Sequence, residues 1–204
     1  MKIRRIISTI AAAALALSLS ACSLFNRSKP GNIDDIVLAD GDLIAEITIE
    51  GYGTVKAKLF PDLAPKAVEN FRRLCEEDYY NGLKIHRVAP DSMMQGGSLN
   101  GDGTGGSDAT IKGEFTANGV ENPLSHVRGT ISMARSSAYD SASSQFFIMH
   151  KTNTSLDGQY AAFGNVTSGI EVVDAIAQNT PVQDSNGTVA AADQPKITKI
   201  SVVD

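Results

Sequence analysis

The stretch IHRVAPDSMMQGGS, residues 85–98, combines two short apolar runs with an arginine, a proline and a Gln-Gly-Gly sequence. A strand that only filled a core would not need Arg87 and Gln95 on either side of Met93 and Met94. We therefore expect this stretch to hold short strands that also carry chemistry. Alternation along a strand predicts that one methionine faces the interior and the other faces outward.

Short apolar runs recur along the chain, bounded by Gly, Ser, Asn or Asp: GTISMAR at 129–135, SQFFIM at 144–149 and YAAFGNV at 160–166. Upstream, 42–50 and 54–60 alternate around Gly-Tyr-Gly, which predicts a hairpin. Helical spacing appears in 62–75, with Pro65 near its start, and again in 169–177. A last strand is predicted at 196–203. Many short strands and two helices favour an antiparallel barrel or sandwich.

The N-terminus has the layout of a bacterial export signal. Lys2, Arg4 and Arg5 precede an apolar run over 6–19, which is too short and too rich in Ala and Ser for a comfortable membrane span. The residues LSAC, 19–22, resemble the lipobox of bacterial lipoproteins, which implies that Cys22 is lipidated. We expect a signal peptide at 1–21, a lipidated cysteine and flexible tether at 22–40, and a folded domain at 41–204. The acyl chains would anchor it to the extracytoplasmic face of the cell membrane.

Removal of the signal peptide leaves 15 basic residues against 23 acidic ones, a side-chain net charge of −8. An acidic domain argues against nucleic acid as a partner. If Cys22 carries lipid, Cys75 is the sole remaining cysteine, so no internal disulfide forms. Cys75 lies in a helical pattern and is predicted to be a small buried apolar residue.

Four motifs occur in order: HRV–P–MMQGG, RGTISMAR, SSQFFI and LDGQYAAFGNV. Together they resemble the cyclophilin-type peptidyl-prolyl isomerases, from about Leu43 to the C-terminus. The resemblance implies a mainly β fold, a closed eight-stranded antiparallel barrel capped by two α-helices. It also implies an isomerase that acts as a monomer on proline-containing polypeptides without a cofactor.

The chemistry explains why an arginine is wanted. Rotation about a prolyl peptide bond breaks the amide conjugation, so the prolyl nitrogen becomes a hydrogen-bond acceptor. A donor aimed at that nitrogen binds the twisted state more tightly than either planar state. By resemblance, Arg87 is the catalytic residue and Gln95 holds the peptide backbone. The resemblance also assigns substrate-binding positions to Met93, Phe147 and Leu156 (the proline pocket), Ala134 and Gln145 (the neighbouring backbone), and Arg135 and Tyr160.

Several positions depart from the family pattern. Tyr160 stands where many relatives have histidine, and Arg135 where asparagine is common. Aromatic residues usual in the family are replaced by Ser92, Ser155 and Ile85. Since a buried aromatic contributes roughly 1.5–3 kcal/mol of apolar contact, we expect a wider, more polar proline pocket with weaker binding. The position of Ser155 is associated with cyclosporin in relatives, so we also expect poor sensitivity to that drug.

Other kinds of site find little support. NGDGTGGSD, 100–108, lacks the Gly-Lys-Ser/Thr ending of a phosphate loop and the twelfth-position Glu of a calcium loop, so a flexible loop beside the cleft is expected. His86, His126 and His150 lack ligand spacing, and no metal site is predicted. No Gly-x-Ser-x-Gly elbow supports a serine triad.

Two rival functions remain open. One is a chaperone of the same fold that binds proline-containing segments with little turnover, which Ser92 and Ser155 keep possible. The more distant one is a solute-binding lipoprotein that feeds a transporter. Its two-lobed α/β pattern is missing from this sequence, and the chain is short for it.

Overall fold

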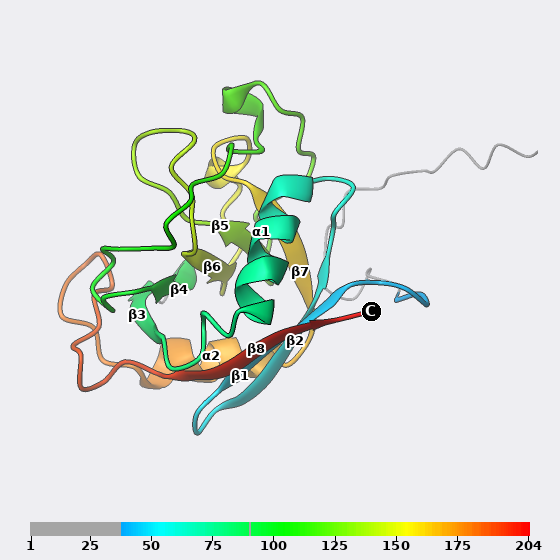
Figure 1. The fold of residues 1–204 in the computed structure, drawn as a ribbon. Coiled ribbons are helices and arrows are strands. Elements are labelled where there is room, and N and C mark those ends of the chain that lie inside the picture. Colours follow the sequence, from blue (N-terminus) through cyan, green and yellow to red (C-terminus); the bar gives the residue numbers. More distant parts are fainter. Residues whose placement is uncertain (1–37, 90) are drawn as a thin grey trace, which may run out of the picture.

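The computed structural model describes residues 38–89 and 91–204. The predicted signal peptide, Cys22 and most of the predicted tether lie outside them. The described chain folds into eight strands, two α-helices and short 3-10 turns (Figure 1). The strands are β1 (Ile44–Ile49), β2 (Gly53–Leu59), β3 (Lys84–Ala89), β4 (Met93–Ser98), β5 (Thr130–Met133), β6 (Phe146–Met149), β7 (Ala162–Ser168) and β8 (Ile197–Val203).

All eight strands belong to one antiparallel sheet with the order β3-β4-β6-β5-β7-β2-β1-β8. The sheet curls so that its edge strands β3 and β8 approach each other. They meet through an isolated bridge between Lys84 and Lys196, with hydrogen bonds from Ile85 N to Pro195 O at 2.9 Å and from Ile197 N to Leu83 O at 2.8 Å. The predicted eight-stranded fold with two helices is confirmed, but the barrel is not fully closed, because no continuous ladder joins β3 and β8 in the described part of the chain.

The β1–β2 hairpin shows why alternation predicts these strands well. Ala45, Ile47 and Ile49 share one face of β1, and each is at most 1% exposed. The register sets Ala45 opposite Ala57 and Ile47 opposite Val55, so the two apolar faces form one surface. That surface lines the main core, as period-2 patterning requires.

Helix α1 (Pro65–Glu76) begins with proline at its first turn, where the missing N–H costs nothing. Ala67, Phe71 and Leu74 are buried, and Phe71 packs against the rings of a core aromatic cluster formed with Tyr80, Phe146 and Phe163. The helix start is capped from far along the chain: both oxygens of Glu114 accept from the backbone N–H groups of Lys66 and Ala67 at 2.9 Å. Such caps contribute about 0.5–2 kcal/mol.

Helix α2 (Ile170–Asn179) starts after Gly169. Only glycine fits this position, because its φ is +80° and a Cβ would lie 2.2 Å from Thr54 O. Helix α2 contacts β2, β3 and β4, whereas α1 contacts β8 and, through Phe71, also β6 and β7. In Figure 1, α1 stands in front of the sheet and α2 lies behind β1 and β8. None of the helices in the described ranges is both long and apolar enough to span a membrane.

Cys75 is 7% exposed, so its predicted burial is confirmed, and its thiol is free among the described residues. Burial, aided by the charge of Glu76, raises its pKa to about 12, so the thiol stays protonated and unreactive. Three predicted strands have other bounds in the structure. The runs 129–135 and 144–149 are strands only over Thr130–Met133 and Phe146–Met149, and the run 160–166 is shifted to Ala162–Ser168. Ala134, Arg135 and Tyr160 therefore lie just outside the strands, beside the site described next.

Candidate functional site

Arg87 begins a row of side chains that crosses four neighbouring strands. The register places Arg87 of β3 opposite Gln95 of β4, and Gln95 opposite Phe147 of β6. On its other side Phe147 pairs with Ser132 of β5. Residues paired in this way lie on the same face of a sheet, with neighbouring strands about 4.8 Å apart. A cation, an amide and an aromatic ring are therefore presented within roughly 10 Å on one face.

Met93 and Met94 enter two different apolar clusters. Met94 belongs to the main core, whereas Met93 packs with Phe147 and Met149 in a second cluster. Their exposed fractions are 8% for Met93 and 1% for Met94. The predicted opposite orientation is confirmed, but the expectation that one faces outward is wrong, because the second face of β4 is also covered.

This second cluster brings together residues from β4, β6, η3 (Thr154–Leu156) and the segments that flank β5 and β7. Its members are Met93, Phe147 and Met149, which are buried, and Ala134, Leu156 and Tyr160, which are partly buried. Five of these six were singled out from the sequence. Met149 was missed, although its spacing of two from Phe147 within SQFFIM was a signal. The ring of Tyr160 meets that of Phe147 edge-on at 5.7 Å.

The guanidinium of Arg87 is fixed at two of its nitrogens. Nε donates to the backbone carbonyl of Asn186 at 2.7 Å, and Nη1 donates to Gln95 Oε1 at 3.2 Å. Among the described residues Nη2 has no hydrogen-bond partner. The two hydrogen bonds fix the plane of the guanidinium group, and Nη2 of this permanently charged group remains as a donor for a ligand.

The carbonyl of Asn186 is itself presented by a tight turn. Asp184 accepts from Asn186 N at 2.9 Å, from Thr188 N at 3.1 Å and from Thr188 Oγ1 at 2.8 Å. These hydrogen bonds lower the pKa of Asp184. Gly187 docks the turn on β3, because its carbonyl accepts from Val88 N at 2.7 Å. This turn was not predicted from the sequence, although Asn-Gly is a common turn signal.

Gln95 connects Arg87 to Gln145, which lies directly before β6. Gln95 Nε2 donates to Gln145 Oε1 at 3.0 Å, and Gln145 Nε2 in turn donates to Gly103 O at 2.9 Å and Gly105 O at 3.1 Å. The orientation of both amides follows from this chain of donors. The loop at 100–108 therefore lies beside the site, as expected, and Gln145 joins it to the Arg87 row.

Arg135 has an environment of its own. Its guanidinium carbon lies 4.8 Å from the ring centroid of Tyr160, 5.1 Å from that of Phe115 and 5.0 Å from that of Tyr139. Nε donates to Gln159 O at 3.0 Å. Cation–π contacts of this kind contribute about 0.5–1 kcal/mol each at exposed sites. The side chain thus braces Tyr160, while Ala134 N, next to it, donates to Gln145 O at 2.9 Å.

His126 is the main residue that sequence reasoning missed. It is fully buried, with Nδ1 at 2.9 Å from Asp157 Oδ1 and Nε2 at 3.1 Å from Ser132 Oγ. Burial lowers the pKa of His126, against the opposing effect of Asp157. The pKa of Asp157 is lowered as well, because hydrogen bonds from Ser125 and His126 outweigh its burial. At neutral pH we therefore assign a neutral ring that donates from Nδ1 to the carboxylate and accepts at Nε2.

These contacts form the Ser–His–Asp chain that no sequence motif predicted. Ser132 is 0% exposed and pairs directly with Phe147 in the sheet. A nucleophile must reach its substrate, and this hydroxyl is covered. The chain therefore packs beside Phe147, where it supports the second cluster, and does not form a hydrolytic centre. In the described part of the chain no three His, Cys, Asp or Glu side chains are grouped to hold a metal ion.

The positions that depart from the family pattern lie in three different environments. Ile85 is fully buried in the main core. Ser92 is half-buried in the turn between β3 and β4, and its carbonyl accepts from His150 N at 2.8 Å and Lys151 N at 3.0 Å. Ser155 is exposed in η3, where its hydroxyl donates to Asn153 Oδ1 at 2.6 Å. Of the three, only Ser92 and Ser155 lie next to the second cluster, because they directly precede its members Met93 and Leu156.

Residues 44–202 match the protein family described as "Cyclophilin type peptidyl-prolyl cis-trans isomerase/CLD". A "Probable peptidyl-prolyl cis-trans isomerase" from Brucella abortus (strain 2308) is 38% identical over 202 residues, covering 96% of this chain and 95% of that protein. "Peptidyl-prolyl cis-trans isomerase B" from Bacillus subtilis (strain 168) is 42% identical over 123 residues, covering 60% and 82%.

A solved structure is similar in fold as well. The crystal structure of a Cryptosporidium parvum cyclophilin type peptidyl-prolyl cis-trans isomerase, determined in the presence of the dipeptide Ala-Pro, superposes with a TM-score of 0.69. The two sequences are 29% identical, and the match covers 79% of this chain and 99% of that one.

Proposed function

Because the chain belongs to the cyclophilin-type peptidyl-prolyl cis-trans isomerase family, we propose that it accelerates rotation about Xaa-Pro bonds in polypeptide substrates. Uncatalysed rotation crosses a barrier of about 18–20 kcal/mol and takes about tens to hundreds of seconds. A catalyst needs only to bind the twisted amide better than the planar ones, so no covalent step is required.

The single observation that carries this proposal is the fixed guanidinium of Arg87 on the same sheet face as Phe147. The second cluster offers an apolar surface for a proline ring, made chiefly of Met93 and Phe147. As the bond twists, the prolyl nitrogen gains a lone pair, and a free N–H of Arg87 donates to it. Because Asn186 and Gln95 already hold the guanidinium, little reorganisation is needed at the moment of rotation. Gln95 and the backbone around Ala134 would hold the neighbouring peptide groups.

The direct test is exchange between the cis and trans forms of an Ala-Ala-Pro-Phe tetrapeptide, measured by NMR with the purified full-length protein in detergent. The proposal predicts exchange that grows in proportion to enzyme concentration. A rate that stays at the uncatalysed value, with a correctly folded protein, would refute it.

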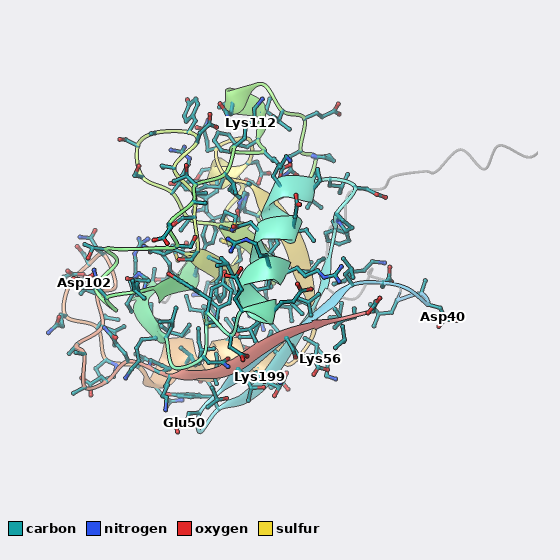
Figure 2. All side chains as sticks on the ribbon, viewed as in Figure 1. Asp40, Glu50, Lys56, Asp102, Lys112 and Lys199 are labelled. Atoms are coloured by element: carbon teal, nitrogen blue, oxygen red, sulfur yellow. The ribbon has the colours of Figure 1, made fainter. Side chains whose placement is uncertain are left out.

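We further propose that the protein acts on the extracytoplasmic face of the cell membrane, held by lipid on Cys22. The LSAC sequence and the basic, apolar segment before it support this, and they lie outside the described residues. The placement of Asp40 also favours a tether: in Figure 2 it lies on the side opposite Asp102, whose loop contacts Gln145. A chain leaving near Asp40 would let the site face away from the membrane.

Anchoring is tested by separating membranes from soluble protein in cells that express the wild type or Cys22→Ala. The wild type is expected in the membrane fraction and should incorporate labelled palmitate. Label on Cys22→Ala, or a soluble wild type, would contradict the lipid anchor.

The rival function, a proline-binding chaperone with little turnover, is favoured by one observation. Serines occupy positions 92 and 155, where the family usually has aromatic residues, which would make the proline pocket more polar. Measuring peptide affinity together with turnover separates the two functions, because a pure binder holds the tetrapeptide without exchanging it.

A further inference from the structure

We propose that His126 is a positioning residue for the proline pocket: it holds the segment 153–157 at both ends and packs against the ring of Phe147. The inference rests on the proposed isomerase function and adds a role for a buried residue. His126 is fully buried, so it does not touch a substrate and acts through the residues that do.

The segment 153–157 carries Leu156, one wall of the second cluster. At its start, Asn153 N donates to the carbonyl of His126 at 2.8 Å. At its end, Asp157 Oδ1 accepts from His126 N at 2.7 Å and lies 2.9 Å from His126 Nδ1. One residue therefore fixes both ends of η3. A loop segment fixed at one end only would leave the position of Leu156 less well defined.

The ring of His126 supports a second wall. It stacks on Phe147 with centroids 5.8 Å apart and planes 19° apart, and it meets Tyr160 edge-on at 6.4 Å. The hydrogen bond from Ser132 to Nε2 fixes the rotation of the ring. Ser132 lies opposite Phe147 in the sheet register, so ring and strand hold Phe147 together. Leu156, Phe147 and Tyr160 are thus all positioned relative to the same imidazole.

The contacts of His126 do not overlap with those of Arg87. The guanidinium is held by Asn186 and Gln95, whereas His126 is held by Asp157 and Ser132. Disturbing His126 should therefore weaken the grip on the proline ring and leave the donor to the twisted amide in place. Kinetically, the KM for proline peptides should rise while kcat is nearly kept.

The test uses substitutions in the full-length protein, with KM and kcat measured on the Ala-Ala-Pro-Phe peptide. His126→Phe keeps a ring beside Phe147 and removes both polar contacts of the imidazole. We expect KM to rise about tenfold, equivalent to about 1.4 kcal/mol of binding, with kcat within about twofold of the wild type.

A pair of substitutions at Asp157 separates the effect of its hydrogen bonds from the effect of its negative charge. Asp157→Asn keeps an oxygen that can accept from His126 and an amide that can donate to Ser125, so KM should stay within about threefold of the wild type. Asp157→Ala removes the acceptor for Ser125 Oγ, His126 N and His126 Nδ1, whereas His126→Phe keeps the backbone contact, so KM should rise at least as much in Asp157→Ala as in His126→Phe. This pair decides the matter if His126→Phe does not fold.

Asp174→Asn serves as the control for a purely structural effect. Asp174 lies in α2, 3.0 Å from His150 Nδ1, and forms a two-pronged ion pair with Arg128. Its loss should lower the melting temperature without moving KM. A wild-type KM in folded His126→Phe and Asp157→Ala would overturn the proposal. If the wild type shows no turnover, the isomerase function fails instead, and the dissociation constant of the same peptide then decides the role of His126.

Discussion

Arg87 Nη1 donates to Gln95 Oε1 at 3.2 Å, and the two residues face each other directly in the register of β3 and β4. Because the carbonyl of Gln95 is used in this way, its amide nitrogen points to Gln145, whose own nitrogen reaches the loop at 103–105. The guanidinium of Arg87, two glutamines and a glycine-rich loop thus form one connected hydrogen-bonded unit.

Gln145→Glu tests this connection. A carboxylate can still accept from Gln95, but it cannot donate to Gly103 O or Gly105 O, so the loop should be released. We expect faster amide hydrogen exchange across 100–106 and kcat/KM lower by about two- to tenfold, since a hydrogen bond contributes about 0.5–1.5 kcal/mol. Gln145→Ala also breaks the bond to Gln95 and should cost more activity. Unchanged loop exchange in Gln145→Glu would speak against the connection.

Gly187→Ala should reduce catalysis from a distance. Gly187 has a φ of +84°, and a Cβ there would lie 2.2 Å from Val88 O, so the turn would shift and withdraw Asn186 O from Arg87. Gly51→Ala is the matched control, because Gly51 has a φ of +75° and open space around it. Both should lose about 1–2 kcal/mol of unfolding free energy from backbone strain. Only Gly187→Ala should also lower kcat, and equal kcat values for the two variants would count against the turn's role.

Ser92→Phe should tighten substrate binding. Ser92 is half-buried in the β3–β4 turn, and its structural hydrogen bonds come from its backbone, so the substitution leaves them intact. A partly buried phenylalanine gains less than the roughly 1.5–3 kcal/mol of full burial. We expect the KM for proline peptides to fall about three- to tenfold. A KM that does not fall would show that the polar position is not what limits affinity.

Two buried histidines should make the free energy of unfolding fall at mildly acidic pH. The pKa of His86 is lowered by burial and by the charge of Arg87, with Asp102 opposing, and that of His126 is lowered by burial, with Asp157 opposing. A lowered folded pKa means that the unfolded state binds more protons. The stabilisation that comes from keeping these histidines neutral is therefore fully present above the pKa of an unfolded histidine, about 6.5. It is lost as the pH falls below that value.

Thermal melts between pH 7.5 and pH 5 check this expectation. The melting temperature of the wild type should fall over that range, and the fall should be smaller in His126→Phe. The carboxylates with lowered pKa, such as Asp157, act in a separate window: their contribution is lost only as the pH falls below about 3.8. A flat wild-type profile down to pH 5 would contradict the burial of neutral histidines.

Much of the fold follows from local pattern. Alternation in β1 and β2 and helical spacing in α1 place Ile47, Val55 and Phe71 in the core, as predicted. Strand lengths follow less well, because β5 ends at Met133 where the chain must turn toward the site. The sheet is less closed than predicted. Whether β3 and β8 form a ladder depends on the irregular segment before Ile197, and the pattern of either strand alone does not show it.

The site divides in the same way. Residues with a motif, such as Arg87, Gln95 and Phe147, could be placed from the sequence. Asn186 acts through a backbone carbonyl, so its side-chain type carries no signal for that role. His126 lies 31 residues before Asp157 and six before Ser132, and only the fold brings the three together. A lone histidine in a sequence gives no sign of such a chain.

The most direct measurement is cis–trans exchange of the Ala-Ala-Pro-Phe peptide by the full-length wild type and by Arg87→Ala, with peptide affinity measured on both. Removing one fixed donor to a transition state typically costs about 10²–10³ in kcat. We expect a loss of that size in Arg87→Ala, with the dissociation constant changed only a few-fold, because the second cluster remains. Equal turnover by two folded proteins would show that Arg87 does not catalyse the rotation.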